Sequence, residues 1–118
     1  MKVAFRVDSS NVIGVGHLKR CIKLAEDLRH KCENIVFITK NLKGNSSSLI
    51  KKKRFKIATI NNNGKKNRLN HDFNKTKIFC KKFKINILVI DNYYLGSEWE
   101  RKIKKYIDKL VVIDDFSN

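Results

Sequence analysis

The sequence contains few cysteines and no long apolar run. Its three cysteines, Cys21, Cys32 and Cys80, are odd in number and show no CxxC spacing. This pattern excludes a disulfide framework and a cysteine-based zinc site, and it favours reduced thiols. No run of about 18 apolar residues is present, which excludes a membrane-spanning helix, and the apolar stretch near Met1 is too short for a signal peptide. We therefore expect a cytoplasmic protein with no membrane partner.

Acidic residues are also scarce, and proline is absent. The chain has 11 Asp and Glu against 27 Lys and Arg, which gives a formal net charge of +16. Charge alone provides only salt-sensitive, non-specific affinity for nucleic acid. The basic residues are scattered, as in 51–54, 65–66 and 104–105, and they do not alternate with aromatic residues. The surplus therefore indicates a compositional bias rather than a specific nucleic-acid site, although a non-catalytic basic binding module stays open as an alternative.

The apolar residues that are present follow an alternating pattern of strands and helices. Hydrophobic residues make up 42% of the 118-residue chain, enough for one domain with a buried core. Continuous apolar runs predict strands, and helical spacing predicts the segments between them. The predicted strands are 2–7, 34–39, 55–60, 85–91 and 110–114, and the predicted helices are 17–31, 46–53, 72–83 and a helix from 97 onward.

Strands that are apolar throughout are typical of a parallel sheet covered on both faces. The sequence therefore predicts an α/β fold, with an open, mostly parallel, Rossmann-like sheet and helices on both sides, over one domain of residues 1–118. Two local predictions accompany it. Ser97 and Glu100 form a capping box at the start of the last helix, and 61–70 is a polar loop, the segment with the strongest signals for flexibility.

Acidic residues stand at the ends of several predicted strands. Asp8 follows the first strand, Asp91 ends the fourth, and Asp114 and Asp115 follow the fifth. Right-handed crossovers bring the carboxyl ends of all strands to one edge, where such sheets bind ligands. Each aspartate can equally be a turn former or a helix cap, so this position alone does not assign a role.

Two glycines precede a histidine in the loop after the first strand. Gly14 and Gly16 lack the third glycine of the dinucleotide fingerprint, which would stand at Lys19, and no P-loop lysine follows. Both glycines permit positive φ angles, so they form a flexible turn that delivers His17 to the first turn of a helix. The positive potential of a helix N-terminus opposes protonation of the imidazole, and a neutral imidazole suits a general base. A histidine that only caps the helix or packs against it stays open.

The opening segment resembles that of the UDP-sugar hydrolases of pseudaminic acid biosynthesis. That family opens with F-R-x-D-[SA]-S-x-x-I-G-x-G-H-x-x-R, followed by a helix with a Leu-Ala pair. The residues that match in register are Phe5, Arg6, Asp8, Ser10, Ile13, Gly14, Gly16, His17 and Arg20. Later segments, VIDNYYL at 89–95, WE at 99–100 and VIDDFSN at 112–118, are similar to further motifs in the same order. Asn92 departs from the family, which usually has histidine or aspartate there.

The resemblance implies the N-terminal lobe of a two-lobed, B-type glycosyltransferase-like fold. A C-terminal lobe that holds UDP would then be absent from this chain, which would be a truncated product or a fragment. The implied reaction is hydrolysis of UDP-2,4-diacetamido-2,4,6-trideoxy-β-L-altropyranose to the free sugar and UDP. A nucleotide-sugar glycosyltransferase lobe of related fold is the alternative enzyme.

The resemblance also implies the site residues. His17 is the expected catalytic base that activates water, and no metal or other cofactor is expected. Tyr93 is a candidate for positioning sugar or water, and Arg20 orients the imidazole, meets an anion or pairs with a strand-end aspartate. The expected substrate-binding residues are Asp8, Gly14, Gly16, Arg20 and Tyr93.

Overall fold

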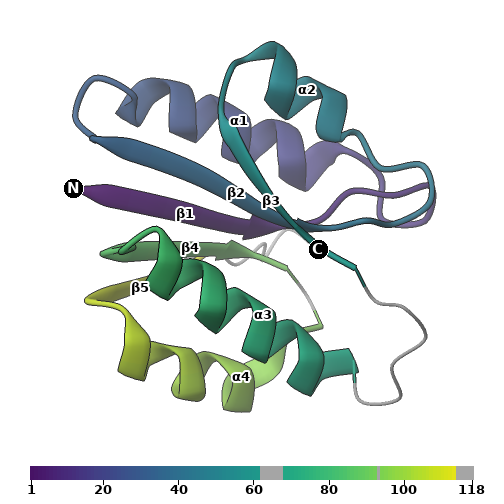
Figure 1. Cartoon of the computed structure of the whole chain (residues 1–118). Helices are drawn as coiled ribbons and strands as arrows, with labels where there is room; N and C mark the ends of the chain where they lie inside the picture. Colours follow the sequence, from purple (N-terminus) through teal and green to yellow (C-terminus); the bar gives the residue numbers. More distant parts are fainter. Residues whose placement is uncertain (62–67, 93, 114–118) are drawn as a thin grey trace.

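The computed structural model describes residues 1–61, 68–92 and 94–113 as a parallel sheet flanked by helices (Figure 1). The sheet has five strands in the order β3-β2-β1-β4-β5, and every neighbouring pair is parallel. The strands are β1 (Lys2–Val7), β2 (Asn34–Lys40), β3 (Lys56–Ile60), β4 (Ile87–Asp91) and β5 (Lys109–Val112). The helices are α1 (Gly16–Leu28), α2 (Ser47–Lys52), α3 (Arg68–Lys82) and α4 (Gly96–Ile103), with a 3₁₀ turn, η1 (Lys104–Tyr106), after α4. The predicted α/β fold with an open parallel sheet is confirmed.

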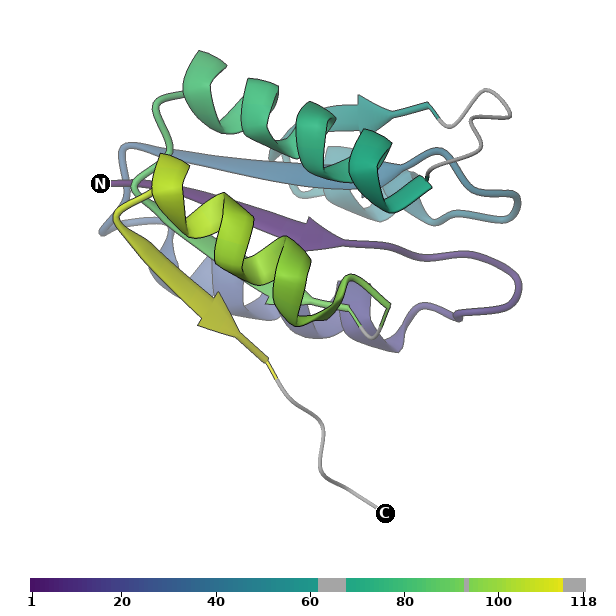
Figure 2. The same cartoon turned by 90° about the horizontal axis from the view of Figure 1, so that it is seen from below.

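Each face of the sheet has its own core. Helices α1 and α2 cover one face, and α3 and α4 cover the other (Figures 1 and 2). On the first face Phe5 and Phe37 stack with ring centroids 5.0 Å apart, beneath the buried Leu18 of α1. On the second face Phe73 of α3 meets Trp99 of α4 edge to face at 6.4 Å. The strands carry apolar side chains on both sides because both faces of the sheet are covered.

The order of the strands places a topological switch point at the carboxyl ends of β1 and β4. The chain passes from β1 through α1 to β2 and through α2 to β3, and then crosses back over β1 to form β4. The segments after β1 and β4 therefore leave the sheet toward opposite faces. Ligands bind at such a switch point in open α/β sheets, so the residues that follow Val7 and those around Asp91 define the candidate site.

Several predicted boundaries of helices and strands differ from the structure. α3 begins at Arg68 rather than at 72, because Arg and Leu are good helix formers that extend it into the predicted loop; residues 62–67 of that loop lie outside the described residues. α1 ends at Leu28 rather than at 31, since Leu28 is the last residue of its apolar face. The predicted strand 110–114 corresponds to β5, which begins at Lys109 and ends at Val112; position 114 lies outside the described residues.

The predicted capping box at the start of α4 is wrong. The helix starts at Gly96 with Leu95 as its N-cap residue, and no side chain caps it. Ser97 consequently lies inside the first turn. Leu95 and Trp99 are both buried, so burial of apolar side chains rather than a cap sets where this helix begins.

Helices α2 and α3 end in the same way. Arg54 and Lys84 adopt left-handed backbone conformations, with φ of 64° and 53°. After α3 the amide of Ile85 donates to the Cys80 carbonyl at 2.9 Å and that of Lys84 to the Lys81 carbonyl at 3.2 Å. This is the Schellman pattern, which normally carries glycine at the left-handed position.

Candidate functional site

The loop after β1 closes on itself before α1 begins. The amide of Gly14 donates to the Ser10 carbonyl at 2.8 Å, and Gly14 has a φ of +83°. Gly16 is the first residue of α1 and is not among the positive-φ glycines, so the positive φ that the sequence permits at this position is not used. A helical φ is already available to any residue. Gly14 therefore sets the turn that brings His17 into the first turn of α1.

His17, Arg20 and Asp91 meet at the carboxyl edge of the sheet. Nδ1 of His17 lies 2.7 Å from Oδ1 of Asp91. Arg20 forms a bidentate ion pair with the same carboxylate, with Nε 2.8 Å from Oδ2 and Nη2 2.8 Å from Oδ1. The pairing of Arg20 with a strand-end aspartate is one of the roles predicted for it. One helix and one strand thus contribute a histidine, an arginine and a buried carboxylate to a single cluster.

The contact with Asp91 determines the tautomer of His17. A carboxylate accepts hydrogen bonds and a guanidinium only donates them. Nη2 of Arg20 lies 3.2 Å from Nδ1, but the 2.7 Å contact with Asp91 is shorter and requires a proton on Nδ1. In the neutral imidazole the basic lone pair is then on Nε2. An oriented imidazole of this kind is the usual arrangement of a histidine base.

Cys21 lies beneath this cluster, with its Sγ 3.7 Å from Oδ2 of Asp91. Burial raises the pKa of the Cys21 thiol well above its ordinary value, and the negative charge of Asp91 raises it further. The side chain therefore remains a thiol, and a thiolate nucleophile is not available at this position.

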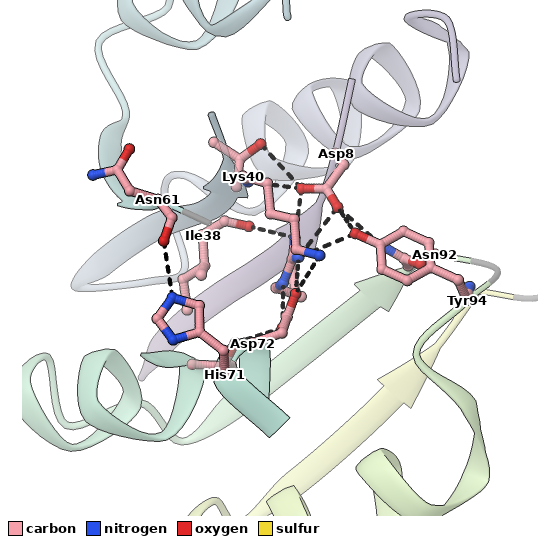
Figure 3. A network of polar contacts seen from close by, with 11 residues as sticks. Asp8, Ile38, Lys40, Asn61, His71, Asp72, Asn92 and Tyr94 are labelled. Atoms are coloured by element: carbon pink, nitrogen blue, oxygen red, sulfur yellow. Dashed lines mark hydrogen bonds and ion pairs between the residues drawn. The ribbon is translucent and has the colours of Figure 1, made fainter. Parts of the chain in front are cut away.

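Asp8 belongs to a second, more deeply buried cluster (Figure 3). Its Oδ1 lies 2.7 Å from Nη1 of Arg6 and accepts the Lys40 amide at 2.8 Å. Its Oδ2 accepts hydrogen bonds from the Tyr94 hydroxyl and from Nδ2 of Asn92. Both oxygens are occupied by protein donors, so these contacts favour a structural role at the switch point. The predicted contact of Asp8 with substrate stays a prediction.

The cluster continues to the start of α3. Arg6 also binds Asp72, with Nε 3.1 Å from Oδ1 and Nη2 2.5 Å from Oδ2. Nζ of Lys40 lies 3.5 Å from Oδ2 of Asp72. The two cations balance the two carboxylates of Asp8 and Asp72 in a site shielded from solvent. Burial acts to raise the pKa of Asp8, but the charge and hydrogen bonds of Arg6 outweigh it, so that pKa lies below its ordinary value.

Sequence reasoning missed most of this cluster. Arg6 was matched within a motif without a role, and Asp72 and Lys40 were not singled out. A signal was available, because Arg6 interrupts an apolar strand and Asp72 shares a helix face with Thr76 and Cys80. A buried charge on a covered strand requires a partner of opposite charge.

Asn92 and Tyr94 belong to the Asp8 cluster, and Asn92 directly follows Asp91 in the chain. Oδ1 of Asn92 accepts the Tyr94 amide at 2.9 Å while its Nδ2 donates to Asp8 at 3.2 Å. Asn92, which departs from the motif described above, therefore has a structural contact with Asp8. Tyr93, predicted to bind substrate, lies outside the described residues, as do Asp114 and Asp115.

A small hollow of about 40 Å³ separates the two carboxylates, and its lining residues are Asp8, Ile13, Asp91, Asn92 and Tyr94. This volume accommodates a water molecule and is too small for a sugar ring. His17 does not line the hollow. Its contact with the hollow is indirect, because it binds Asp91, which does line it.

A metal-binding cluster and a membrane-spanning helix are both absent from the described residues. No group of three or more His, Cys, Asp and Glu side chains in 1–61, 68–92 and 94–113 is arranged to hold a metal ion. No helix in the same part of the chain has both the length and the apolar character needed to cross a membrane.

Comparison with known proteins gives one distant relative. The chain is 29% identical over 116 residues to the uncharacterized protein MJ1062 of Methanocaldococcus jannaschii. The alignment covers 98% of this chain and 22% of the archaeal protein, so the chain spans about a fifth of that relative's length. No family model matches the sequence.

Proposed function

We propose that this chain is the catalytic lobe of a nucleotide-sugar hydrolase with His17 as its general base. The observation that carries the proposal is the 2.7 Å contact between Nδ1 of His17 and Asp91 at the switch point of the sheet. The resemblance of residues 5–20 to the pseudaminic acid UDP-sugar hydrolases supplies the substrate class. The compound we propose is UDP-2,4-diacetamido-2,4,6-trideoxy-β-L-altropyranose, and the proposed location is the cytoplasm.

The proposed reaction displaces UDP with water. Nε2 of His17 accepts a proton from water as the water oxygen forms a bond to the anomeric carbon. The bond between that carbon and the diphosphate oxygen breaks, and UDP leaves with the electron pair. Diphosphate is a good leaving group, so activation of water is the demanding step. General base catalysis of this type contributes roughly 10²- to 10⁴-fold.

Asp91 and Arg20 act through His17 in this proposal. Asp91 fixes the imidazole orientation and stabilises the imidazolium that forms as the proton is transferred. The bidentate contact with Arg20 holds the Asp91 carboxylate in place. Tyr93 remains the proposed group for positioning sugar or water, and Gly14 shapes the loop above the site.

A second lobe that holds UDP completes the proposal. Val12, Ile13, Leu69 and Tyr94 are large apolar residues that are exposed, and they lie in segments that follow carboxyl ends of strands. Exposed apolar side chains gathered at one edge are typical of a surface that contacts another domain. We therefore propose that the UDP-binding lobe covers this edge and encloses the substrate at the switch point of the sheet.

The test is a product assay in ¹⁸O-labelled water. The chain is joined to the UDP-binding lobe of a family hydrolase, and the UDP-sugar is supplied. We expect UDP and a free sugar that carries ¹⁸O at its anomeric carbon, since water attacks that carbon. Label in the phosphate would contradict the proposed step. Sugar transfer to an added alcohol without hydrolysis would instead identify the lobe as part of a glycosyltransferase.

The remaining alternative, a basic binding module, makes a different prediction. Retention of RNA or DNA at about 0.15 M salt, together with no turnover of the UDP-sugar by the two-lobed protein, would favour that module over the hydrolase.

A further inference from the structure

A larger hollow lies beside the candidate site on the same edge of the sheet. Its volume is about 410 Å³, within the usual range for a small-molecule site. We name it the Lys40 hollow, and its lining residues are Lys40, Leu42, Arg68, Leu69 and Tyr94. Tyr94 lines both this hollow and the small one between Asp8 and Asp91.

The charge of the lining has one sign. Lys40 and Arg68 are cations, and none of the described residues that line the hollow is a carboxylate. The side chain of Lys40 is only 7% exposed, yet its ion pair in the described part of the chain is the 3.5 Å contact with Asp72. Asp72 is already engaged twice by Arg6. An ammonium carries three N–H donors, so this long contact leaves Lys40 with donors to offer an anion.

The rest of the lining is apolar and held in place. Nζ of Lys40 lies 4.8 Å from the centroid of the Tyr94 ring, whose hydroxyl donates to Asp8. Leu42 and Leu69 complete the wall. Nε2 of His71 lies 2.8 Å from the carbonyl oxygen of Asn61, which ties the first turn of α3 to the end of β3 (Figure 3).

We infer that the Lys40 hollow binds an organic phosphate. Lys40 and Arg68 contact its phosphate oxygens, and the ring of Tyr94 with Leu42 and Leu69 contacts its organic part. This site is distinct from a nucleotide site on a second lobe, and it does not depend on the proposed hydrolysis. A nucleotide and a sugar phosphate share the chemistry that the lining recognises, so both serve as probes.

The experiment is an NMR titration of the 118-residue chain with uridine 5′-monophosphate, glucose 1-phosphate and inorganic phosphate, at about 0.15 M salt. We expect at least one organic phosphate to bind about fivefold or more tightly than inorganic phosphate, with the largest shifts at Leu42, Arg68 and Leu69. The stronger of the two organic probes identifies the source of the ligand. Shifts spread over all basic surfaces would show non-specific attraction to the +16 chain and would overturn the inference.

Arg68→Gln is the principal variant, because Arg68 is exposed and the change leaves the core intact. We expect it to weaken binding about five- to tenfold. The matched control is Arg101→Gln, which removes the same charge from an exposed position of α4 outside the hollow. Equal losses in both variants would overturn the inference.

Two further variants separate this site from the catalytic proposal. Lys40→Met retains the apolar stem, and we expect a comparable loss of binding in protein whose folding is checked by circular dichroism. His17→Asn removes the proposed base, and we expect phosphate binding to stay within about twofold of the parent chain. Loss of binding in His17→Asn alone, with Arg68→Gln unaffected, would place the phosphate at the other site and contradict the Lys40 hollow.

Discussion

Asp91 is the residue on which the geometry of the candidate site depends. One buried carboxylate accepts hydrogen bonds from His17 and Arg20, and each of these side chains also lies near the other. The last residue of β4 thus fixes two side chains of α1.

We predict that Asp91→Asn lowers kcat of the two-lobed protein by about 10²-fold or more. An amide can present its NH₂ to Nδ1, which favours the wrong tautomer and moves the basic lone pair away from Nε2. Steady-state kinetics and a UDP binding measurement test this, and UDP affinity should stay within about twofold. Asp27→Asn, an exposed change on α1, is the control. Turnover equal to that of the control would remove Asp91 from the mechanism.

Asp8 contributes to stability rather than to the proposed catalysis, because it forms a buried ion pair with Arg6. We predict that Asp8→Asn destabilises the chain by about 3–5 kcal/mol at pH 7, because it leaves the buried Arg6 with one carboxylate in place of two. Because the folded state lowers the pKa of Asp8, its contribution is fully present above its unfolded pKa of about 3.9. It is lost as the pH falls through that value toward the lower folded pKa.

Urea unfolding at several pH values measures this effect. The stability of the wild-type chain should fall more steeply below about pH 4 than that of Asp8→Asn, so the two curves converge in acid. Parallel curves for the two proteins would show that Asp8 is not coupled to Arg6 as the structure indicates.

At the scale of elements, the ends of α2 and α3 carry a local strain. Lys84 occupies the left-handed position of a Schellman motif, where a side chain costs about 1 kcal/mol relative to glycine. We predict that Lys84→Gly stabilises the chain by about 0.5–1 kcal/mol in urea unfolding. Lys82→Gly, within the last turn of α3, should destabilise it by a similar amount. A loss of stability in both variants would contradict the assigned backbone conformation.

The strands and helices could be predicted because apolar residues are spaced differently along a strand and along a helix. Runs rich in apolar residues, such as 87–90, predicted all five strands, and their alternation with helices predicted the parallel sheet. The start of α4 was predicted wrongly because a capping motif was weighted above the burial of Leu95, which depends on tertiary packing. A sequence pattern indicates a local preference for helix. Where the helix ends also depends on which apolar side chains become buried in the folded protein.

The candidate site could be predicted only in part for a related reason. Position at the carboxyl edge follows from topology, so His17 and Asp91 were placed at one edge, and Arg20 was expected to meet a strand-end aspartate. The pairing of Arg6 with Asp72 joins residues 66 positions apart and depends on how α3 seats against β1. No local pattern gives that register.

At the scale of the whole molecule, the proposal requires a second lobe. We predict that the 118-residue chain alone shows no measurable hydrolysis of the UDP-sugar, because binding of the remote nucleotide is what positions the anomeric carbon. A sensitive assay for released UDP, with the two-lobed protein as positive control, measures this. Robust turnover by the chain alone would show that one lobe contains a complete active site.

The most direct test of the central claim is the kinetic effect of His17→Asn in the two-lobed protein. If His17 is the base, kcat should fall by about 10²- to 10⁴-fold, UDP affinity should stay nearly unchanged, and the loss of rate at low pH should disappear. If the imidazole only joins α1 to β4 through Asp91, the variant should lose about 1 kcal/mol of stability and keep its turnover per folded molecule. A His17→Asn protein with normal kcat and a normal pH profile would contradict the account.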